Sequence, residues 1–512
     1  MTQSRSDWGL WACGALVLGA FLIRVYHLDA QSLWQDEIVT VTYSQGNFGQ
    51  ALVNSMVQFR ASAPLHYLIV NLTALHVSLT EGMLRLPDVL WGTLSVAVTF
   101  LIGRRLFGIG AALLGTFLLA ILPLHVYYSR EMRFYSLATF FGVLMVFTLI
   151  RALERRTPSA WRWYGITVTG GLLTYYYDGL IIAATGVWVW LLWRTTQPGS
   201  AARSRRRADF YAFLRATAAA ILIALIWAIP EILTDDPAFA QRFTFPTMPP
   251  VMGSIATPFL FHLTAPFYAD MPFYPGGSMG VDPLGSLWAV FAWISIMVGS
   301  MIALNTLRRS EWGRSRESHL LLMGAIGVGG IGVVLILNYV MGYFWSPRQF
   351  VIFAPFLTLT AAGAVTLIGL RLNRPRTQIR LILLVAAILS LILLRPALEG
   401  VFEVQKEDWR GGTRYIQRHW QPGDVLFALY REAHTLLYAP EWKVGEDVLQ
   451  LSGDSAPLEA AFEAGKTRLW LFYLEVYPPK PLEGWINEHC ERQTKGIGVG
   501  VRVYLCLAQE GQ

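Results

Sequence analysis

Charged side chains are scarce in this chain: they make up 15% of its 512 residues, against roughly 25% in an ordinary soluble protein. This scarcity, with a hydrophobic content of 54%, argues against a single large soluble core and favours a membrane protein. Lysine is missing from residues 1–398, which hold 29 arginines and 17 acidic residues. Residues 399–512 hold all five lysines and more acidic than basic residues. The two regions therefore occupy different environments.

Long apolar runs fill the first region. An α-helix needs about 20 apolar residues to cross a hydrocarbon core of about 30 Å. Eleven runs are candidates: 8–28, 84–103, 109–128, 134–153, 161–177, 179–193, 213–233, 284–307, 319–341, 349–370 and 379–398. The sequence predicts a mainly α fold with about 11 transmembrane helices over 1–398, the fifth and sixth short enough for a tight hairpin. Residues 8–28 lack a small-residue cleavage site and are expected to remain as the first span.

Arginine marks one side of the predicted bundle. Short loops rich in arginine stay in the cytoplasm. With the N-terminus inside, the cytoplasmic loops hold 20 arginines, whereas the short connections on the opposite side hold only Arg130, Arg133 and Arg348. The arginine run at 203–207 therefore indicates orientation and contact with anionic lipids, and no nucleic acid. The acidic region 399–512 is expected outside the cytoplasm.

Three segments are predicted on the outer side. Residues 29–83 are apolar with scattered His and Asn, which suits helices lying along the membrane interface. Residues 234–283 form a long loop rich in Pro, Phe and Tyr, and loops of that length are commonly functional. Residues 399–512 predict a small α/β domain, with an amphipathic helix at 408–419 and strands at 425–429, 467–472 and 499–505.

The three cysteines divide between the two regions. Cys490 and Cys506 lie in the predicted α/β domain, where an oxidising outer compartment permits a disulfide. A pair of free buried thiols is the alternative. Cys13 lies in the first predicted span, with no evident partner.

Two adjacent carboxylates, Asp36 and Glu37, follow the first span on the outer side. In a chain with so few charged residues, two adjacent carboxylates at a membrane surface suggest a catalytic role. The structural alternative is that the pair marks the water-facing start of a loop.

Several motifs, in their order along the chain, resemble those of bacterial glycosyltransferase family 39. This group includes the protein O-mannosyltransferase-like enzymes and is related to the aminoarabinose transferases of lipid A. The motifs are Trp34/Asp36/Glu37, Ala63-Pro64-Leu65-His66-Tyr67, Leu84-Arg85-Leu86-Pro87, Gly103-Arg104-Arg105-Leu106-Phe107-Gly108 and Tyr127-Tyr128-Ser129-Arg130-Glu131-Met132-Arg133-Phe134-Tyr135. Weaker matches follow at 347–350 and 408–424, so the resemblance spans most of the chain.

The resemblance implies a GT-C fold enzyme in the cytoplasmic (inner) membrane of a bacterium. Such an enzyme takes a sugar from a polyprenyl-phosphate donor and passes it to a hydroxyl acceptor on protein, lipid or glycan, with inversion at the anomeric carbon. The acceptor needs a general base within hydrogen-bond reach, and we expect Asp36 in that role. Glu37 is expected to orient the acceptor, to help hold a metal, or to anchor the loop.

The departing phosphate gains negative charge, so cations should gather near it. Arg133 and Arg348 are the best candidates, with Arg130 and Arg60 behind them, because arginine holds phosphate oxygens in a bidentate manner. Each of them can instead extend to lipid headgroups from a span end. Glu131 is expected to pair with Arg133 and set its direction.

Other residues support this predicted site. Tyr135 flanks Arg133, and Tyr67 follows His66 in the second motif. The chain departs from the family's pattern at 60–63, which lacks the usual acid, His or Lys and one proline, and at 174–177, which lacks the usual His. Both places serve metal or donor binding in relatives, so a divalent metal is left open. His66 and His262 are expected to be its ligands or to be hydrogen-bonded structural residues.

Asp178 lies between the two short spans, where it either lines the donor site or caps a turn. A transporter or flippase of lipid-linked saccharides is the alternative function. That alternative requires ionisable residues at mid-membrane, and the middles of the predicted spans are nearly free of acids. The sequence therefore favours chemistry at one surface.

Overall fold

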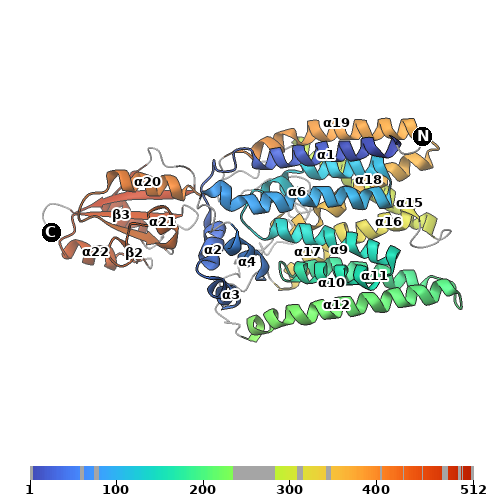
Figure 1. The fold of residues 1–512 in the computed structure, drawn as a ribbon. Coiled ribbons are helices and arrows are strands. Elements are labelled where there is room, and N and C mark those ends of the chain that lie inside the picture. Colours follow the sequence, from blue (N-terminus) through green and yellow to red (C-terminus); the bar gives the residue numbers. More distant parts are fainter. Residues whose placement is uncertain are drawn as a thin grey trace.

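The computed structural model describes residues 4–57, 63–73, 80–233, 283–307, 315–341, 347–403, 406–429, 432–451, 454–474, 482–493, 498 and 500–508. Arg60, His262 and nearly all of the predicted loop 234–283 lie outside the described residues, so the expectations for them stay predictions. Figure 1 shows a bundle of long helices that leads into a small sheet domain at the C-terminus.

Helices occupy all eleven of the predicted spans. They are α1 (Ser4–Val25), α6 (Glu81–Leu106), α7 (Ile109–Ile121) with α8 (Pro123–Tyr128), α9 (Tyr135–Arg155), α10 (Pro158–Leu172), α11 (Asp178–Arg194), α12 (Ala201–Leu233), α15 (Pro283–Leu307), α16 (Arg316–Gly324) continued by η2 (Ala325–Gly329) and α17 (Gly330–Met341), η3 (Pro347–Phe353) with α18 (Ala354–Arg371), and α19 (Arg376–Gly400). Among the described residues, seven helices are long and apolar enough to cross a membrane. The helices α10 and α11 have 15 and 17 residues, as the predicted hairpin requires. The mainly α membrane fold is confirmed.

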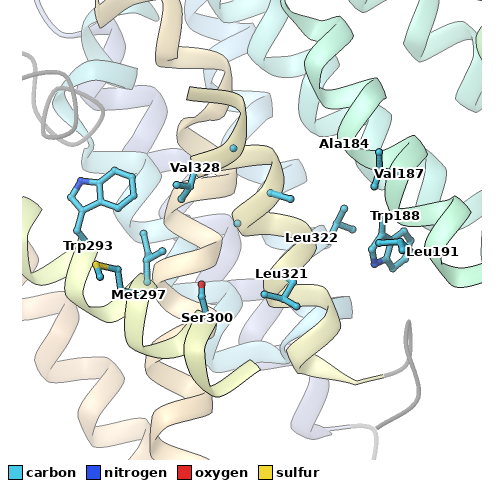
Figure 2. A pocket seen from close by; sticks show the side chains of 14 residues that line it. Ala184, Val187, Trp188, Leu191, Trp293, Met297, Ser300, Leu321, Leu322 and Val328 are labelled. Carbon is cyan, nitrogen blue, oxygen red and sulfur yellow. The ribbon is translucent and has the colours of Figure 1, made fainter. Parts of the chain in front are cut away.

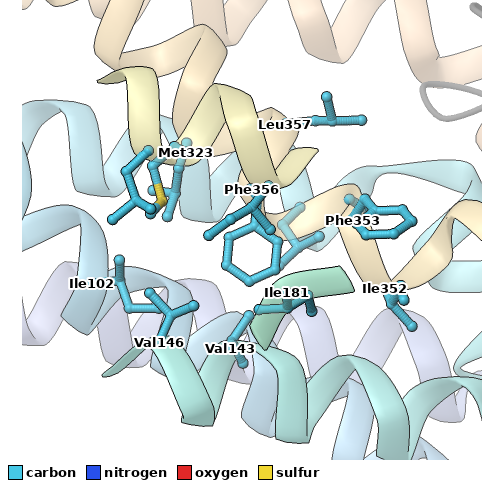
Figure 3. Close-up of a cluster of buried hydrophobic side chains, with 14 of the residues drawn as sticks. Ile102, Val143, Val146, Ile181, Met323, Ile352, Phe353, Phe356 and Leu357 are labelled. Carbon is cyan, nitrogen blue, oxygen red and sulfur yellow. The ribbon is translucent and has the colours of Figure 1, made fainter. Parts of the chain in front are cut away.

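The bundle packs around α18, which is buried along most of its length. Its Phe356 meets Ile102 of α6 and Ile181 of α11 in one apolar cluster (Figure 3). Small residues allow the helices to approach closely. A Cβ added at Gly103 of α6 would lie 2.9 Å from the Cα of Ala112 in α7, so any larger residue would push these two helices apart.

The arginine-rich connections lie at the end of the bundle that points away from the sheet domain (Figure 1). Three ion pairs link neighbouring helices at this end: Arg105 with Glu154, Arg156 with Asp209, and Arg371 with Glu317. Among the described residues, the arginines that the sequence assigned to one side therefore share one end of the bundle.

Three short helices occupy the opposite end, next to the sheet domain (Figure 1). They are α2 (Gln35–Ser44), α3 (Phe48–Val57) and α4 (Leu65–Leu72). Helices thus occur within 29–83, and their expected position along the membrane interface stays a prediction. The first of them, α2, carries the acidic pair in its first turn.

The C-terminal domain contains a five-stranded sheet in the order β2-β1-β3-β5-β4. The strands β1 (Val425–Leu429), β2 (Val448–Leu451) and β3 (Arg468–Leu474) are parallel, while β5 (Val501–Leu507) is antiparallel to β3 and to β4 (Cys490–Gln493). The accompanying helices are α20 (Trp409–His419), α21 (Glu432–Tyr438), α22 (Ala456–Glu463) and α23 (Glu483–His489). The small α/β domain is confirmed, with the predicted helix and three predicted strands in place. The sequence missed β2 and β4.

Cys490 and Cys506 are register partners on β4 and β5 and form a disulfide. Of the two alternatives left open by the sequence, the structure contains the bonded pair. Cys13 of α1 is a free thiol.

Candidate active site

The acidic pair occupies the first turn of α2, directly after Trp34 in extended conformation. Carboxylates are favoured there, because the exposed amides of a helix N-terminus carry partial positive charge. Successive residues of an α-helix point about 100° apart. Asp36 and Glu37 therefore face different surroundings although they are neighbours in the chain.

Asp36 lies between two arginines that are distant in sequence. Its Oδ2 is 2.8 Å from Nη1 of Arg348, at the start of η3, and 3.7 Å from Nη2 of Arg133, in the connection between α8 and α9. Nη1 of Arg133 also donates to the backbone oxygen of Asp36 and to the Thr40 hydroxyl, each at 3.1 Å. The Asp36 side chain is 27% exposed. The structure thus brings an accessible carboxylate and both best arginine candidates together.

Tyrosines surround this group. Tyr67 of α4 is fully buried, and Tyr128 packs edge-on against Tyr135 with ring centres 5.2 Å apart. Burial acts to lower the pKa of Arg133, but the Asp36 carboxylate, together with the phenols of Tyr67 and Tyr135, more than offsets this and holds the pKa above its usual value. Arg133 therefore stays positively charged at neutral pH, next to the buried tyrosines.

Glu37 faces the protein interior and is fully buried. Its two oxygens accept from Nε and Nη2 of Arg85 at 2.8 and 2.7 Å, and Oε1 also accepts from the Met132 amide at 2.9 Å. Burial acts to raise the pKa of the Glu37 carboxyl, but the charges of Arg85 and Lys406 and these hydrogen bonds outweigh it and lower the pKa to about 2. Of the three roles considered for Glu37, this geometry fits the anchoring of the loop, because the carboxylate is not exposed to solvent.

The predicted partner of Glu131 needs a correction. We expected it to pair with Arg133, but its Oε1 lies 3.2 Å from Nζ of Lys406, while the carboxylate beside Arg133 belongs to Asp36. Burial raises the pKa of the Glu131 carboxyl, Lys406 opposes that rise, and the negative charge of Glu37 adds to it. Glu131 and Glu37 therefore share Lys406, whose Nζ is 3.6 Å from Oε2 of Glu37.

Arg130 also differs from its predicted place. Its Nη2 donates to the His27 carbonyl at 3.2 Å, and its guanidinium lies 4.5 Å from the centre of the Phe402 ring. These contacts hold it against the segment after α1 and the end of α19, apart from the Asp36 group. The structure does not place Arg130 with the two arginines of the predicted phosphate site.

His66 lies in a buried pair and not at an open metal site. Its Nε2 is 3.1 Å from Oδ1 of Asp88, and both residues are almost completely enclosed. Across the described ranges, no group of three or more His, Cys, Asp or Glu side chains is arranged to hold a metal. These residues do not fit a metal centre, and we assign no chemical step to one.

Asp178 lies in the first turn of α11 and is fully buried. Within the described part of the chain neither of its carboxylate oxygens has a hydrogen-bond partner. A Cβ added at Gly171 would approach one of these oxygens to 2.8 Å, so the side chain points toward α10. Asp178 is enclosed among the described residues, and its expected roles at the donor site or as a turn cap stay predictions.

Sequence reasoning missed Arg85 and Lys406 as partners of the acidic pair. Arg85 stood inside one of the quoted motifs, but nothing local indicated that its guanidinium binds a carboxylate 48 positions away. Lys406 carried a weak signal, because it is the first of only five lysines.

The described residues also enclose an apolar cavity, whose lining does not include the Asp36 group. It has a volume of about 490 Å³ and lies between α11, α15 and α16 with η2 (Figure 2). Trp188, Trp293, Met297 and Leu321 contribute to its wall, which contains no charged side chain. This cavity therefore offers no acidic or basic side chain for a proton transfer.

Comparisons with known proteins identify similar folds and one matching family model. Residues 61–229 match the family model described as dolichyl-phosphate-mannose-protein mannosyltransferase. The fold is similar to that of ArnT from Cupriavidus metallidurans in the apo state, with a TM-score of 0.54 at 14% identity over 98% of each chain. The chain has the GT-C glycosyltransferase fold.

Two further solved structures share the GT-C fold with this enzyme. ArnT from Cupriavidus metallidurans bound to undecaprenyl phosphate gives a TM-score of 0.53 at 14% identity, over 98% of this chain and 99% of that one. The archaeal oligosaccharyltransferase AglB from Archaeoglobus fulgidus, in complex with an inhibitory peptide and a dolichol-phosphate, gives 0.56 at 12% identity, over 92% and 70%. No curated protein sequence matches the chain. It is a multi-pass membrane glycosyltransferase.

Proposed function

We propose that this enzyme transfers a sugar from a polyprenyl-phosphate donor to a hydroxyl acceptor, with Asp36 as the general base and with inversion at the anomeric carbon. One observation carries the proposal: an accessible carboxylate lies within 4 Å of two guanidinium groups, those of Arg133 and Arg348. Base and phosphate-binding cations are the two parts that such a transfer requires.

The reaction balances with these residues alone. The acceptor hydroxyl gives its proton to the Asp36 carboxylate as its oxygen forms a bond to the anomeric carbon. The bond between that carbon and the phosphate oxygen breaks, and the electron pair leaves with the polyprenyl phosphate. Arg133 and Arg348 stabilise the negative charge that develops on the phosphate, the kind of electrostatic support that contributes most to catalysis in many enzymes.

Arg348 has a further role in this proposal, because its Nη1 pairs with Asp36 at 2.8 Å. A carboxylate held by two cations stays ionised but is a weak base. A donor phosphate competes for the same guanidinium, since arginine binds phosphate in a bidentate manner. Donor binding would therefore move Arg348 from Asp36 to the phosphate and free the base for the acceptor.

Two similar structures support the class of carrier. One is ArnT bound to undecaprenyl phosphate, and the other is AglB with a dolichol-phosphate. A polyprenyl phosphate is the chemistry they have in common. We propose the same class for this chain, while the sugar and the acceptor, whether protein, lipid or glycan, are for experiment to identify.

The proposed location is the outer face of the cytoplasmic membrane of a bacterium. The arginine-rich turns lie at the end of the bundle opposite α2, the helix that carries Asp36 (Figure 1), and such turns remain in the cytoplasm. The Cys490–Cys506 disulfide also suits an oxidising compartment. We accordingly propose a transmembrane domain at 1–398 and an extracytoplasmic domain at 399–512.

The test uses the full chain in lipid nanodiscs, supplied with a panel of radiolabelled undecaprenyl-phosphate sugars and a cell-envelope fraction as acceptor. Asp36→Asn should reduce transfer by about 10²- to 10⁴-fold, the usual contribution of a general base. It should keep its affinity for undecaprenyl phosphate. Asp29→Asn, an exposed change just before the same helix, is the matched control and should keep wild-type turnover.

Arg348→Met should weaken binding of undecaprenyl phosphate by about tenfold to a hundredfold, because a hydrogen bond to a charged group contributes about 1.5–3 kcal/mol. Arg374→Met, at the opposite end of the bundle, should leave binding unchanged. Wild-type turnover by Asp36→Asn would overturn the assignment of the base. Movement of a labelled lipid-linked sugar across vesicles without any transfer product would overturn the proposed reaction in favour of transport.

A further inference from the structure

We infer that the C-terminal domain positions the general base, with Glu407 as the residue that fixes the first turn of α2. The inference rests on the proposed role of Asp36. It assigns a part in the geometry of the transfer site to Glu407 and to its neighbours Lys406, Trp409 and Arg410.

Glu407 connects the sheet domain to the first turn of α2. Its Oε2 accepts from the backbone amide of Gln35 at 3.0 Å and from the indole Nε1 of Trp409 at 2.7 Å. Gln35 directly precedes Asp36, and its amide is one of the four that a helix cannot satisfy internally. Glu407 therefore replaces the missing backbone partner at the position next to the base.

Trp409 makes this link rigid. It begins α20, is 1% exposed and belongs to the apolar core on one face of the sheet. The same core contains Ile38 of α2 and Leu33 from the loop before it. The apolar interior of the C-terminal domain thus continues without interruption to the helix that carries Asp36.

A second set of contacts holds the loop before α2. The Arg410 guanidinium donates to the carbonyls of Asp29 at 3.2 Å and Ala30 at 2.9 Å, and it pairs with Glu81 of α6 at 2.9 Å. The Tyr438 hydroxyl accepts from the Leu33 amide at 2.9 Å. Residues of α20 and α21, in the C-terminal domain, therefore hold this loop in place through hydrogen bonds.

Lys406 also links the C-terminal domain to α2. Its Nζ lies between Glu37 of α2 and Glu131 of the α8–α9 connection, at 3.6 and 3.2 Å. Its backbone amide donates to Gln31 at 3.2 Å. The segment 406–410 thus touches the loop, the first turn of α2 and the connection that supplies Arg133.

Such contacts matter because transfer depends on small distances. A misplacement of about 1 Å at a catalytic group can cost about 10²-fold in rate. Glu407 acts through the backbone of Gln35 and has no contact with the reacting atoms in the proposed reaction. It is a positioning residue, so its loss should lower kcat and leave the affinity for the donor phosphate nearly intact.

The test compares three variants of the full chain in nanodiscs. Glu407→Ala removes both hydrogen bonds, whereas Glu407→Gln can keep both through its amide oxygen. Glu403→Ala is the matched control, because Glu403 lies in the same segment with an exposed side chain and offers only its backbone carbonyl to Gln31. Three quantities are measured: kcat and KM for transfer, binding of undecaprenyl phosphate, and hydrogen exchange of the amides of 34–40.

We expect Glu407→Ala to lower kcat by about 10- to 100-fold, with binding of undecaprenyl phosphate within about threefold of wild type and faster exchange over 34–40. Glu407→Gln should recover most of the rate, and Glu403→Ala should match wild type. Unchanged kcat and exchange in Glu407→Ala would overturn the inference. Equal losses of kcat, donor binding and thermal stability would also overturn it, because they indicate a purely structural role. The exchange measurement needs no substrate, so it reports on positioning even if the wild type shows no sugar transfer.

Discussion

The buried pair of Glu37 and Arg85 allows a quantitative prediction about what holds the site together. The two side chains are 0% and 2% exposed and share two hydrogen bonds, at 2.7 and 2.8 Å. Arg85 also donates to the carbonyls of Leu28, Gln31 and Ser32. Glu37→Ala would leave this guanidinium enclosed without its carboxylate, beside the loop that leads to Asp36.

The magnitude follows from burial. Removing one partner of a buried, hydrogen-bonded ion pair costs about 3–5 kcal/mol, whereas removing one partner of an exposed pair costs about 1 kcal/mol or less. Glu154 provides the matched control, because it pairs with Arg105 while the two side chains are 47% and 30% exposed. Glu37→Ala should therefore lower the free energy of unfolding several times more than Glu154→Ala.

The assay is equilibrium unfolding in lipid–detergent micelles titrated with SDS and followed by tryptophan fluorescence. Adding Arg85→Met to Glu37→Ala closes a double-mutant cycle. Glu37→Ala leaves the Arg85 guanidinium without its carboxylate, and Arg85→Met removes that guanidinium. The double variant should therefore lose less free energy of unfolding than the sum of the two single losses.

Two outcomes would refute the reasoning. One is a loss in Glu37→Ala no larger than that in Glu154→Ala. The other is additivity of the two single changes within about 0.5 kcal/mol, the scatter expected of independent sites. Either would mean that the pair does not anchor the first turn of α2.

Two further predictions concern pH and the cysteines. The pKa of Glu37 is lowered from 4.5 to about 2. The ionised carboxylate therefore contributes fully to the free energy of unfolding above about pH 4.5, and this contribution disappears as the pH falls toward 2. The gap in unfolding free energy between wild type and Glu37→Gln should be constant near neutral pH and narrow below about pH 4.5; a gap that widens on acidification would contradict this. For the cysteines, alkylation of denatured protein without reductant should label one thiol, that of Cys13, and all three after reduction. Three labels without reductant would show that Cys490 and Cys506 are not bonded.

The helical architecture was largely predictable from sequence, because a membrane span depends on the local composition of about 20 residues. Each of the eleven apolar runs is helical in the structure. The missed strands show the limit of local patterns. β4 (Cys490–Gln493) has only four residues and few apolar side chains, and it becomes a strand by pairing with β5.

The candidate site was predictable in part. Asp36, Arg133 and Arg348 were selected from motifs and from the side of the membrane they share, and the structure brings them together. The predicted pairing of Glu131 with Arg133 was wrong, because Lys406 approaches Glu131 only after the chain has folded. Arg130 contacts the His27 carbonyl, which its sequence context did not indicate. A sequence pattern cannot rank partners that lie hundreds of positions apart.

The sequence by itself determined that this is a membrane protein, where its spans lie and which end of the bundle collects arginine, because these properties follow from side-chain hydrophobicity and charge along short segments. Only the tertiary structure decided what the two adjacent carboxylates do. One turn of helix points Asp36 toward Arg133 and Arg348 and Glu37 toward Arg85 and Lys406. Packing against distant segments leaves the Asp36 side chain partly exposed and encloses that of Glu37, which supports the proposed roles of base and anchor.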